Sequence, residues 1–174
     1  MTDYNLPQEI LKFKGIFDMD LLYKNMRDWL VRRGYYFEEP IYKNKPNPMG
    51  GVEDEITWDC WIKETDYFKF WITIDFHTWE LKTIEVIKEG EKKKMNQARL
   101  TIYFNARVET DYQHRWDKTP FLIWLNNVYE KYIIKPEIDN IYTDKLYYYV
   151  LKLQNIAKEC FKMETKGSEY GDVW

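Results

Sequence analysis

Between Asp54 and Glu109 the chain places an apolar residue at every second position, in three successive sets. A period of two puts all members of a set on one side of a β-strand, so each strand has one side suited to burial. Patterns with the period of a helix occur only before and after this block. We therefore predict an α+β domain in which a curved antiparallel sheet packs against helices. The three sets are Ile56, Trp58, Cys60 and Ile62, then Phe68, Phe70, Ile72, Ile74 and Phe76, then Ala98, Leu100, Ile102, Phe104, Ala106 and Val108.

Three helices are expected around the sheet. Asp18 and Asp20 can cap a first helix that runs to Arg33, and Gly34 suits a left-handed C-terminal cap. A short strand over 11–17 precedes this helix, with Gly15 at a bulge or close approach, and another strand over 35–42 follows it.

The other two helices are expected after the sheet. Thr119 followed by Pro120 favours a helix start, and Pro136 is expected to end that helix. A long last helix is expected over 143–163, with its apolar residues facing inward. The inward stripe of the middle helix should consist of Phe121, Leu125, Val128, Tyr129, Tyr132 and Ile133.

The 174 residues suit a single domain, which we place at 1–165, followed by a polar tail at 166–174. The strand that starts at Phe68 is expected to bend near Thr78 and to continue through Ile87. Polar or turn-forming segments are expected at 1–9, 43–51, 64–66 and 88–91.

Composition favours an ordered chain with an unusual number of aromatic residues. Eight Trp, 15 Tyr and nine Phe make up 18% of the chain, and the net charge is −3. Either an AT-rich genome or contact surfaces rich in Tyr and Trp would explain this excess. The polar N-terminus and the lack of a membrane-length apolar run predict a cytoplasmic protein with no membrane partner.

The sequence offers little for catalysis. His77 and His114 are the only histidines and lack the close spacing of metal ligands. Cys60 and Cys160 have no neighbouring basic motif that would activate a thiol. Nucleotide-binding and serine-hydrolase motifs are absent from the sequence. We therefore predict no catalytic residues, no metal site and no cofactor, and so a protein that is not an enzyme.

The order of elements resembles the START-like, or helix-grip, superfamily, in which a curved sheet wraps around the last helix. Two stretches, KFKGIFDMDLLYKNMRDWL and DKLYYYVLKL, are also similar to small uncharacterised archaeal proteins. The first resemblance implies that apolar small molecules could bind between the sheet and the last helix, unless large side chains fill that space. The residues that would line such a cavity are Trp58, Phe70, Ile72, Phe104, Leu146, Tyr149, Val150 and Leu153.

Aromatic and basic residues alternate on the other side of the predicted strands. They are Trp61, Tyr67, Trp71, Tyr103, Arg99 and Arg107. Such a surface suits a protein partner, and this is our first hypothesis: a non-enzymatic interaction module. Two alternatives are a carrier of an apolar small molecule and a protein associated with RNA or the ribosome. The middle helix could also simply cover this side of the sheet.

Overall fold

The structure is a computed structural model that describes residues 2–46, 51–88, 91–116 and 118–161. It shows an α+β fold built on one open antiparallel sheet, in the order β1-β6-β5-β4-β3, with β2 also paired to β6. The strands are β1 (Thr2–Asn5), β2 (Glu9–Phe17), β3 (Tyr36–Pro46), β4 (Val52–Lys63), β5 (Phe68–Lys88) and β6 (Glu91–Thr110).

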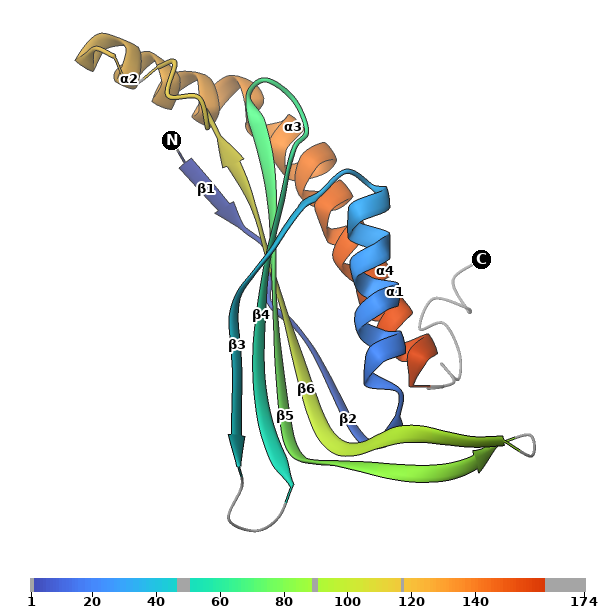
Figure 1. Cartoon of the computed structure of the whole chain (residues 1–174). Coiled ribbons are helices and arrows are strands. Elements are labelled where there is room, and N and C mark those ends of the chain that lie inside the picture. The colour runs from blue at the N-terminus through green and yellow to red at the C-terminus, as the bar shows by residue number, and fades with distance from the viewer. Residues whose placement is uncertain (1, 47–50, 89–90, 117, 162–174) are drawn as a thin grey trace, which may run out of the picture.

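The helices lie on one side of this sheet (Figure 1). Helix α1 follows β2, and a long helical run follows β6. The elements are α1 (Met19–Arg32), α2 (Pro120–Val128), the π-helical η1 (Tyr129–Ile134), α3 (Lys135–Glu137), the π-helical η2 (Ile138–Thr143) and α4 (Asp144–Cys160). In Figure 1 the run begins beyond one end of the sheet and then descends beside α1.

The alternation of apolar residues produces the core as predicted. Alternate residues of β4, β5 and β6 are buried beneath α1 and α4, and the fully buried Trp58 and Phe104 are among the largest. Leu22, Met26 and Leu30 of α1 are fully buried as well. This packing removes the apolar side of each strand from water, which is the main favourable contribution to folding.

Both expected ends of α1 are confirmed. The Asp18 carboxylate accepts a hydrogen bond from the Leu21 N–H at 2.9 Å. Gly34 has a φ of 84°, and its N–H donates to the Val31 carbonyl at 2.9 Å. A side-chain acceptor at the start and a left-handed residue at the end satisfy backbone groups that the helix leaves free.

The expected bend of the long strand is also confirmed. The register between β5 and β6 shifts between Trp79 and Lys82, and Glu80 has a φ of 58°. Such a bulge bends a strand and increases its twist. Beyond it the two strands turn under the helices, so the sheet is strongly curved (Figure 1).

The prediction of two separate helices after the sheet is wrong, because Pro136 does not end the helix. Pro136 lies in the three-residue α3, between η1 and η2. Proline lacks an N–H and crowds the carbonyl four residues before it. The π-helical turns on both sides are wider and have i→i+5 hydrogen bonds. They accommodate the missing N–H and the crowded carbonyl, so the chain remains helical from Pro120 to Cys160.

Two segments expected to be irregular are strands instead. Thr2–Asn5 forms β1 because β6 extends past β2 and offers it backbone partners, with Thr2 opposite Thr110. Lys43–Pro46 continues β3 against β4. Residues 47–50 of the expected loop, residues 89–90 of the expected turn, and residues 162–174, which include the end of the expected last helix and the expected tail, lie outside the described residues. Among the described helices, none is long and apolar enough to cross a membrane.

Candidate interaction surface

The side of the sheet away from the helices carries alternating aromatic, charged and polar residues, and we call it the open face. Its central strands β4, β5 and β6 supply most of them, because every second residue there points away from the core. The open face includes Asp59, Trp61, Lys69, Trp71, Thr73, Asp75, His77, Tyr103, Asn105 and Arg107.

One line of paired residues crosses four neighbouring strands of this face. Tyr36 is opposite Trp61, Trp61 is opposite Trp71, and Trp71 is opposite Arg107. We call these four residues the tryptophan row. The Tyr36 and Trp61 rings have centroids 4.9 Å apart, and the two indoles are 6.2 Å apart. Cross-strand aromatic pairs of this kind stabilise a sheet while leaving part of each ring exposed.

Cations lie directly against the indoles of the tryptophan row. The Lys69 Nζ is 4.2 Å from the Trp61 ring centroid and 4.0 Å from that of Trp71. The Arg107 guanidinium lies 4.8 Å from the Trp71 centroid. Desolvation by burial lowers the pKa of Lys69, while the carboxylate of Glu109 acts in the opposite direction. The row is therefore a rigid, cationic and aromatic patch.

A buried carboxylate fixes the orientation of Trp71. The Trp71 Nε1–H donates to Glu109 Oε2 at 2.5 Å, and Glu109 is buried. Arg107 lies at the edge of this arrangement, where its Nε is 3.8 Å from Asp3 Oδ2. The indole cannot rotate without breaking its hydrogen bond, so the surface it presents is preorganised.

The surface is hollowed on both sides of the two indoles. A broad cleft of about 570 Å³ is lined by Trp61 together with Tyr36, Lys63 and their neighbours. A smaller cleft of about 80 Å³ is lined by Trp71, Arg107 and four other residues. Paired hollows beside exposed rings can accept side chains of a partner.

The centre of the open face is polar and internally satisfied. Asp75 accepts hydrogen bonds from Thr57 at 2.7 Å and from Asn105 at 3.4 Å. Asp59 accepts one from Thr73 at 2.8 Å. These carboxylates are held by neighbours rather than aimed at a shared point, so they do not form a paired acid–base site.

A second charged group lies further along β4 and β5. The His77 Nε2 is 2.6 Å from Glu53 Oε1, and the His77 ring stacks on Trp79 at 3.8 Å. Glu53, Glu55 and His77 each offer one ligand atom within 4.8 Å of the others, which is a spacing that can hold a metal ion. Lys45 Nζ already pairs with Glu55 at 2.9 Å and lowers the pKa of that carboxyl. A cation would have to displace this ammonium.

The two histidines are not brought together. His77 is opposite Thr101 on β6, whereas His114 follows the end of that strand at Thr110. Thr101 and Thr110 are nine residue steps apart, a span of roughly 30 Å at about 3.4 Å per residue, so the histidines belong to well-separated parts of the sheet. They cannot share one catalytic pocket.

The other residues expected on the aromatic side are dispersed. Tyr103 lies opposite Asp75 on the open face. Arg99 lies 5.2 Å from the Trp79 ring, beyond the polar centre. Tyr67 precedes β5, and its hydroxyl reaches Glu130 at 2.9 Å and Asn126 at 2.8 Å. The structure therefore gathers Trp61, Trp71 and Arg107, and it places Tyr67 against the helical run.

The residues expected to line a cavity lie in the core. Trp58, Phe70, Ile72, Phe104, Leu146, Val150 and Leu153 are buried, and Tyr149 is half-buried against Trp29. Glu39 was not expected beside them. Its Oε2 accepts hydrogen bonds from Tyr23 at 2.7 Å and from the buried Trp58 indole at 3.0 Å, and it thereby joins β3 to α1 and β4.

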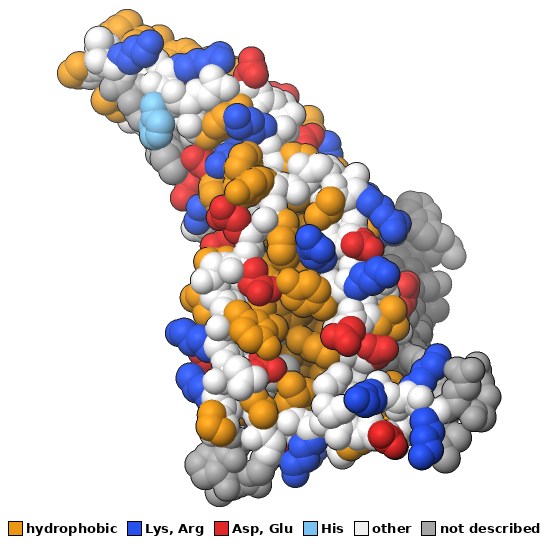
Figure 2. All heavy atoms as spheres, in the orientation of Figure 1, with side chains coloured by type: hydrophobic (Ala, Val, Ile, Leu, Met, Phe, Trp, Pro, Cys, Tyr) orange, Lys and Arg blue, Asp and Glu red, His pale blue; other side chains and the backbone are white. Residues whose placement is uncertain are grey.

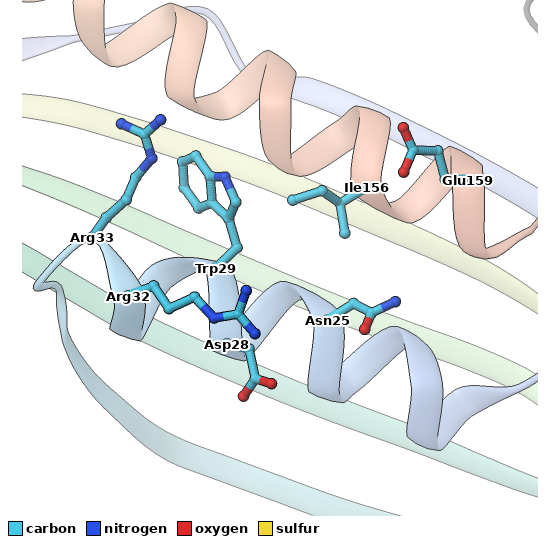
Figure 3. A pocket seen from close by; sticks show the side chains of 7 residues that line it. All are labelled: Asn25, Asp28, Trp29, Arg32, Arg33, Ile156 and Glu159. Carbon is cyan, nitrogen blue, oxygen red and sulfur yellow. The ribbon is translucent and has the colours of Figure 1, made fainter.

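A cleft of about 420 Å³ lies between α1 and α4 (Figure 3). Trp29 points from α1 toward α4, and the Arg33 guanidinium lies 4.6 Å from the Trp29 ring and 4.4 Å from the Tyr149 ring. Asp28 and Glu159 offset the charges of the two arginines that line the cleft. Because neither sign dominates, the lining does not select a class of ligand.

Comparison with family models, with curated proteins and with solved structures gives no match for this chain. The functional argument therefore depends on the geometry of the surfaces described above.

Proposed function

We propose that the chain is a non-enzymatic interaction module of START-like build that binds a protein partner through the tryptophan row. The observation that carries this proposal is the pair of part-exposed indoles, Trp61 and Trp71, with Lys69 between them. Trp and Arg are the residues most enriched at interface positions where truncation is costly.

The order of elements supports the START-like build. A strand and a helix precede a meander of four strands, and a long helix follows. The first strand segments pair with the last strand of the meander, so the sheet order is β1-β6-β5-β4-β3. The sheet curves around the helices on its inner side (Figure 1). This arrangement leaves the opposite side of the sheet available to a partner.

The charges on the tryptophan row favour a partner that carries acidic side chains. Lys63, Lys69 and Arg107 lie on or beside the row, and the carboxylate of Glu109 already binds Trp71. A protein can bring a carboxylate to Lys69 or Arg107 and place apolar side chains in the flanking hollows. The net charge of −3 gives the chain no general attraction to a phosphate backbone, which favours a protein over RNA.

The test uses a variant that combines Trp61→Ala and Trp71→Ala. Immobilised full-length protein captures partners from the source cell extract, and the affinity of each purified partner is then measured. We expect the variant to lose roughly 30-fold or more in affinity, as hot-spot truncations do. Trp124→Ala, at an exposed tryptophan on α2, is the matched control and should bind normally.

Two results would overturn the proposal. One is unchanged binding of every captured partner by the double variant, with urea unfolding showing that it is folded. The other is capture of RNA alone, with an affinity that falls steeply as salt is added, because phosphate contacts release counterions. Lys69→Ala should weaken binding to an acidic partner without changing the far-UV circular dichroism.

A second candidate function is the carriage of an apolar small molecule between the sheet and the helices. Hydrophobic side chains line the opening between β3 and α1 (Figure 2), where Glu39 holds Tyr23 and Trp58. Native mass spectrometry of protein purified without detergent should then show an added mass. A clean mass of the chain alone would contradict the carrier hypothesis.

A further inference from the structure

The start of the long helical run exposes large apolar side chains at one end of the molecule. Phe121 and Trp124 of α2 are 65% and 58% exposed, and Tyr132 and Ile133 of η1 are 70% and 66% exposed. The predicted inward stripe of this segment is therefore wrong at Phe121, Tyr132 and Ile133. The stripe cannot reach the core because α2 extends past the end of the sheet (Figure 1).

The apolar residues of α2 surround most of the helix. At 100° per residue, the exposed Phe121, Ile123 and Trp124 point in directions spread over about 160°, and the half-buried Leu122 extends this spread to about 260°. Asn126 is the one buried residue of this helix. A groove on a folded protein covers one stripe of a helix, whereas a fluid apolar medium can cover several sides at once.

Exposed cations flank this apolar segment without exposed acids between them. Lys118, Lys131 and Lys135 are all exposed. Between residues 118 and 136 the only acidic side chain is that of Glu130, and it is 4% exposed and hydrogen-bonded. Figure 2 shows hydrophobic side chains and basic side chains together over α2. The exposed Glu137 lies two residues after Lys135, so the exposed side chains of residues 118–137 carry three positive charges and one negative charge, whereas the whole chain has a net charge of −3.

We propose that α2 and η1 dock the protein onto an anionic lipid surface, with the helix lying in the interface, in place of the expectation of no membrane partner. The apolar medium would receive Phe121, Ile123 and Trp124, and the lysines would contact lipid phosphates or carboxylates. The 15 residues of α2 and η1 span roughly 23 Å at 1.5 Å per residue, which is shorter than the hydrocarbon core of about 30 Å. The segment therefore lies on the bilayer rather than crossing it.

The experiment measures sedimentation of the full chain with two kinds of vesicle. One contains phosphatidylcholine alone, and the other contains equal parts of phosphatidylcholine and phosphatidylserine. We expect binding to the second kind, weakened by added salt. Replacing Lys118, Lys131 and Lys135 by Gln should reduce the partition coefficient about fivefold for each lysine. Combining Phe121→Ala with Trp124→Ala should reduce it by about 10-fold or more.

Tyr42→Ala is the matched control, because Tyr42 is 61% exposed on β3 and lies outside this segment. It should sediment like the original chain. Urea unfolding of each variant establishes that the fold is retained, as expected for exposed positions.

Three results would overturn the proposal. The first is the absence of binding to the anionic vesicles. The second is binding that the Phe121 and Trp124 substitutions leave unchanged. The third is a dimer mass in sedimentation equilibrium without vesicles that Trp124→Ala converts to a monomer, because a second copy of the chain would then be the occupant.

Discussion

Removing the hydroxyl of Tyr67 should destabilise the protein by about 2 kcal/mol, since this hydroxyl binds a buried charge. Glu130 is 4% exposed, and its Oε1 accepts hydrogen bonds from Tyr67 at 2.9 Å, Thr110 at 2.5 Å and Asn126 at 3.2 Å. Tyr67→Phe removes one of these donors and leaves the carboxylate in place. For a chain of this length the loss corresponds to a fall of about 6 °C in Tm.

The assay is urea unfolding at neutral pH, followed by circular dichroism. We expect the urea concentration at the midpoint of unfolding to fall. The slope of the unfolding free energy against urea concentration should stay constant, because the surface exposed on unfolding does not change. Tyr36→Phe is the matched control. It removes a hydroxyl that donates at 2.9 Å to Glu38, which is exposed, and it should cost less than about 0.5 kcal/mol. Equal midpoints for Tyr67→Phe and the original chain would refute this argument.

Three further predictions concern pH, thiol chemistry and backbone conformation. Burial works to raise the pKa of Glu130, but the hydrogen bonds from Thr110, Thr2, Tyr67 and Asn126 together hold it below its ordinary value of 4.5. The charged carboxylate therefore stabilises the fold above about pH 4.5, and this stabilisation is lost as the pH falls through the lowered pKa of the folded state. The difference in urea midpoint between Glu130→Gln and the original chain should therefore shrink in acid. Burial raises the pKa of the Cys60 thiol to about 12, so iodoacetamide should modify the half-buried Cys160 first and Cys60 only on unfolding, as peptide mass mapping can show. Gly51→Ala should cost more stability than Gly34→Ala in the same urea assay, because both have positive φ but an added Cβ at Gly51 would lie 2.9 Å from the Glu80 carbonyl carbon, against 3.7 Å from the nearest atom at Gly34.

The alternation of apolar residues was sufficient to predict the sheet, because a period of two directly determines which side of a strand is buried. The same reasoning applies to Trp61 and Trp71. A three-residue turn at 64–66 would place Trp61 opposite Lys69, whereas in the structure Trp61 lies opposite Trp71 and Lys63 opposite Lys69. The sequence therefore indicated the side of the sheet on which both tryptophans lie, but their pairing and the contact of Lys69 with both rings required the structure.

Other features depended on contacts that no local pattern records. Glu39 turns toward Trp58 beside the register shift between Glu38 and Ile41. Pro40 marks that shift in the sequence, but nothing there indicates that Glu39 reaches Trp58. The middle helix shows the converse case. Its apolar residues predicted burial, but whether a stripe is buried depends on whether a sheet lies beneath it, and α2 lies past the end of the sheet.

The two proposed surfaces share one structural support at the end of β6. Neighbouring residues there face opposite sides of the sheet: Glu109 accepts the Trp71 indole N–H on the open face, and Thr110 donates to Glu130 of the helical run. The Thr110 hydroxyl also accepts a hydrogen bond from the Thr2 N–H in β1. Because a two-residue period links these contacts, a shift of β6 by one residue would disrupt both at once. The end of this strand thus determines both the orientation of the tryptophan row and the position from which α2 projects.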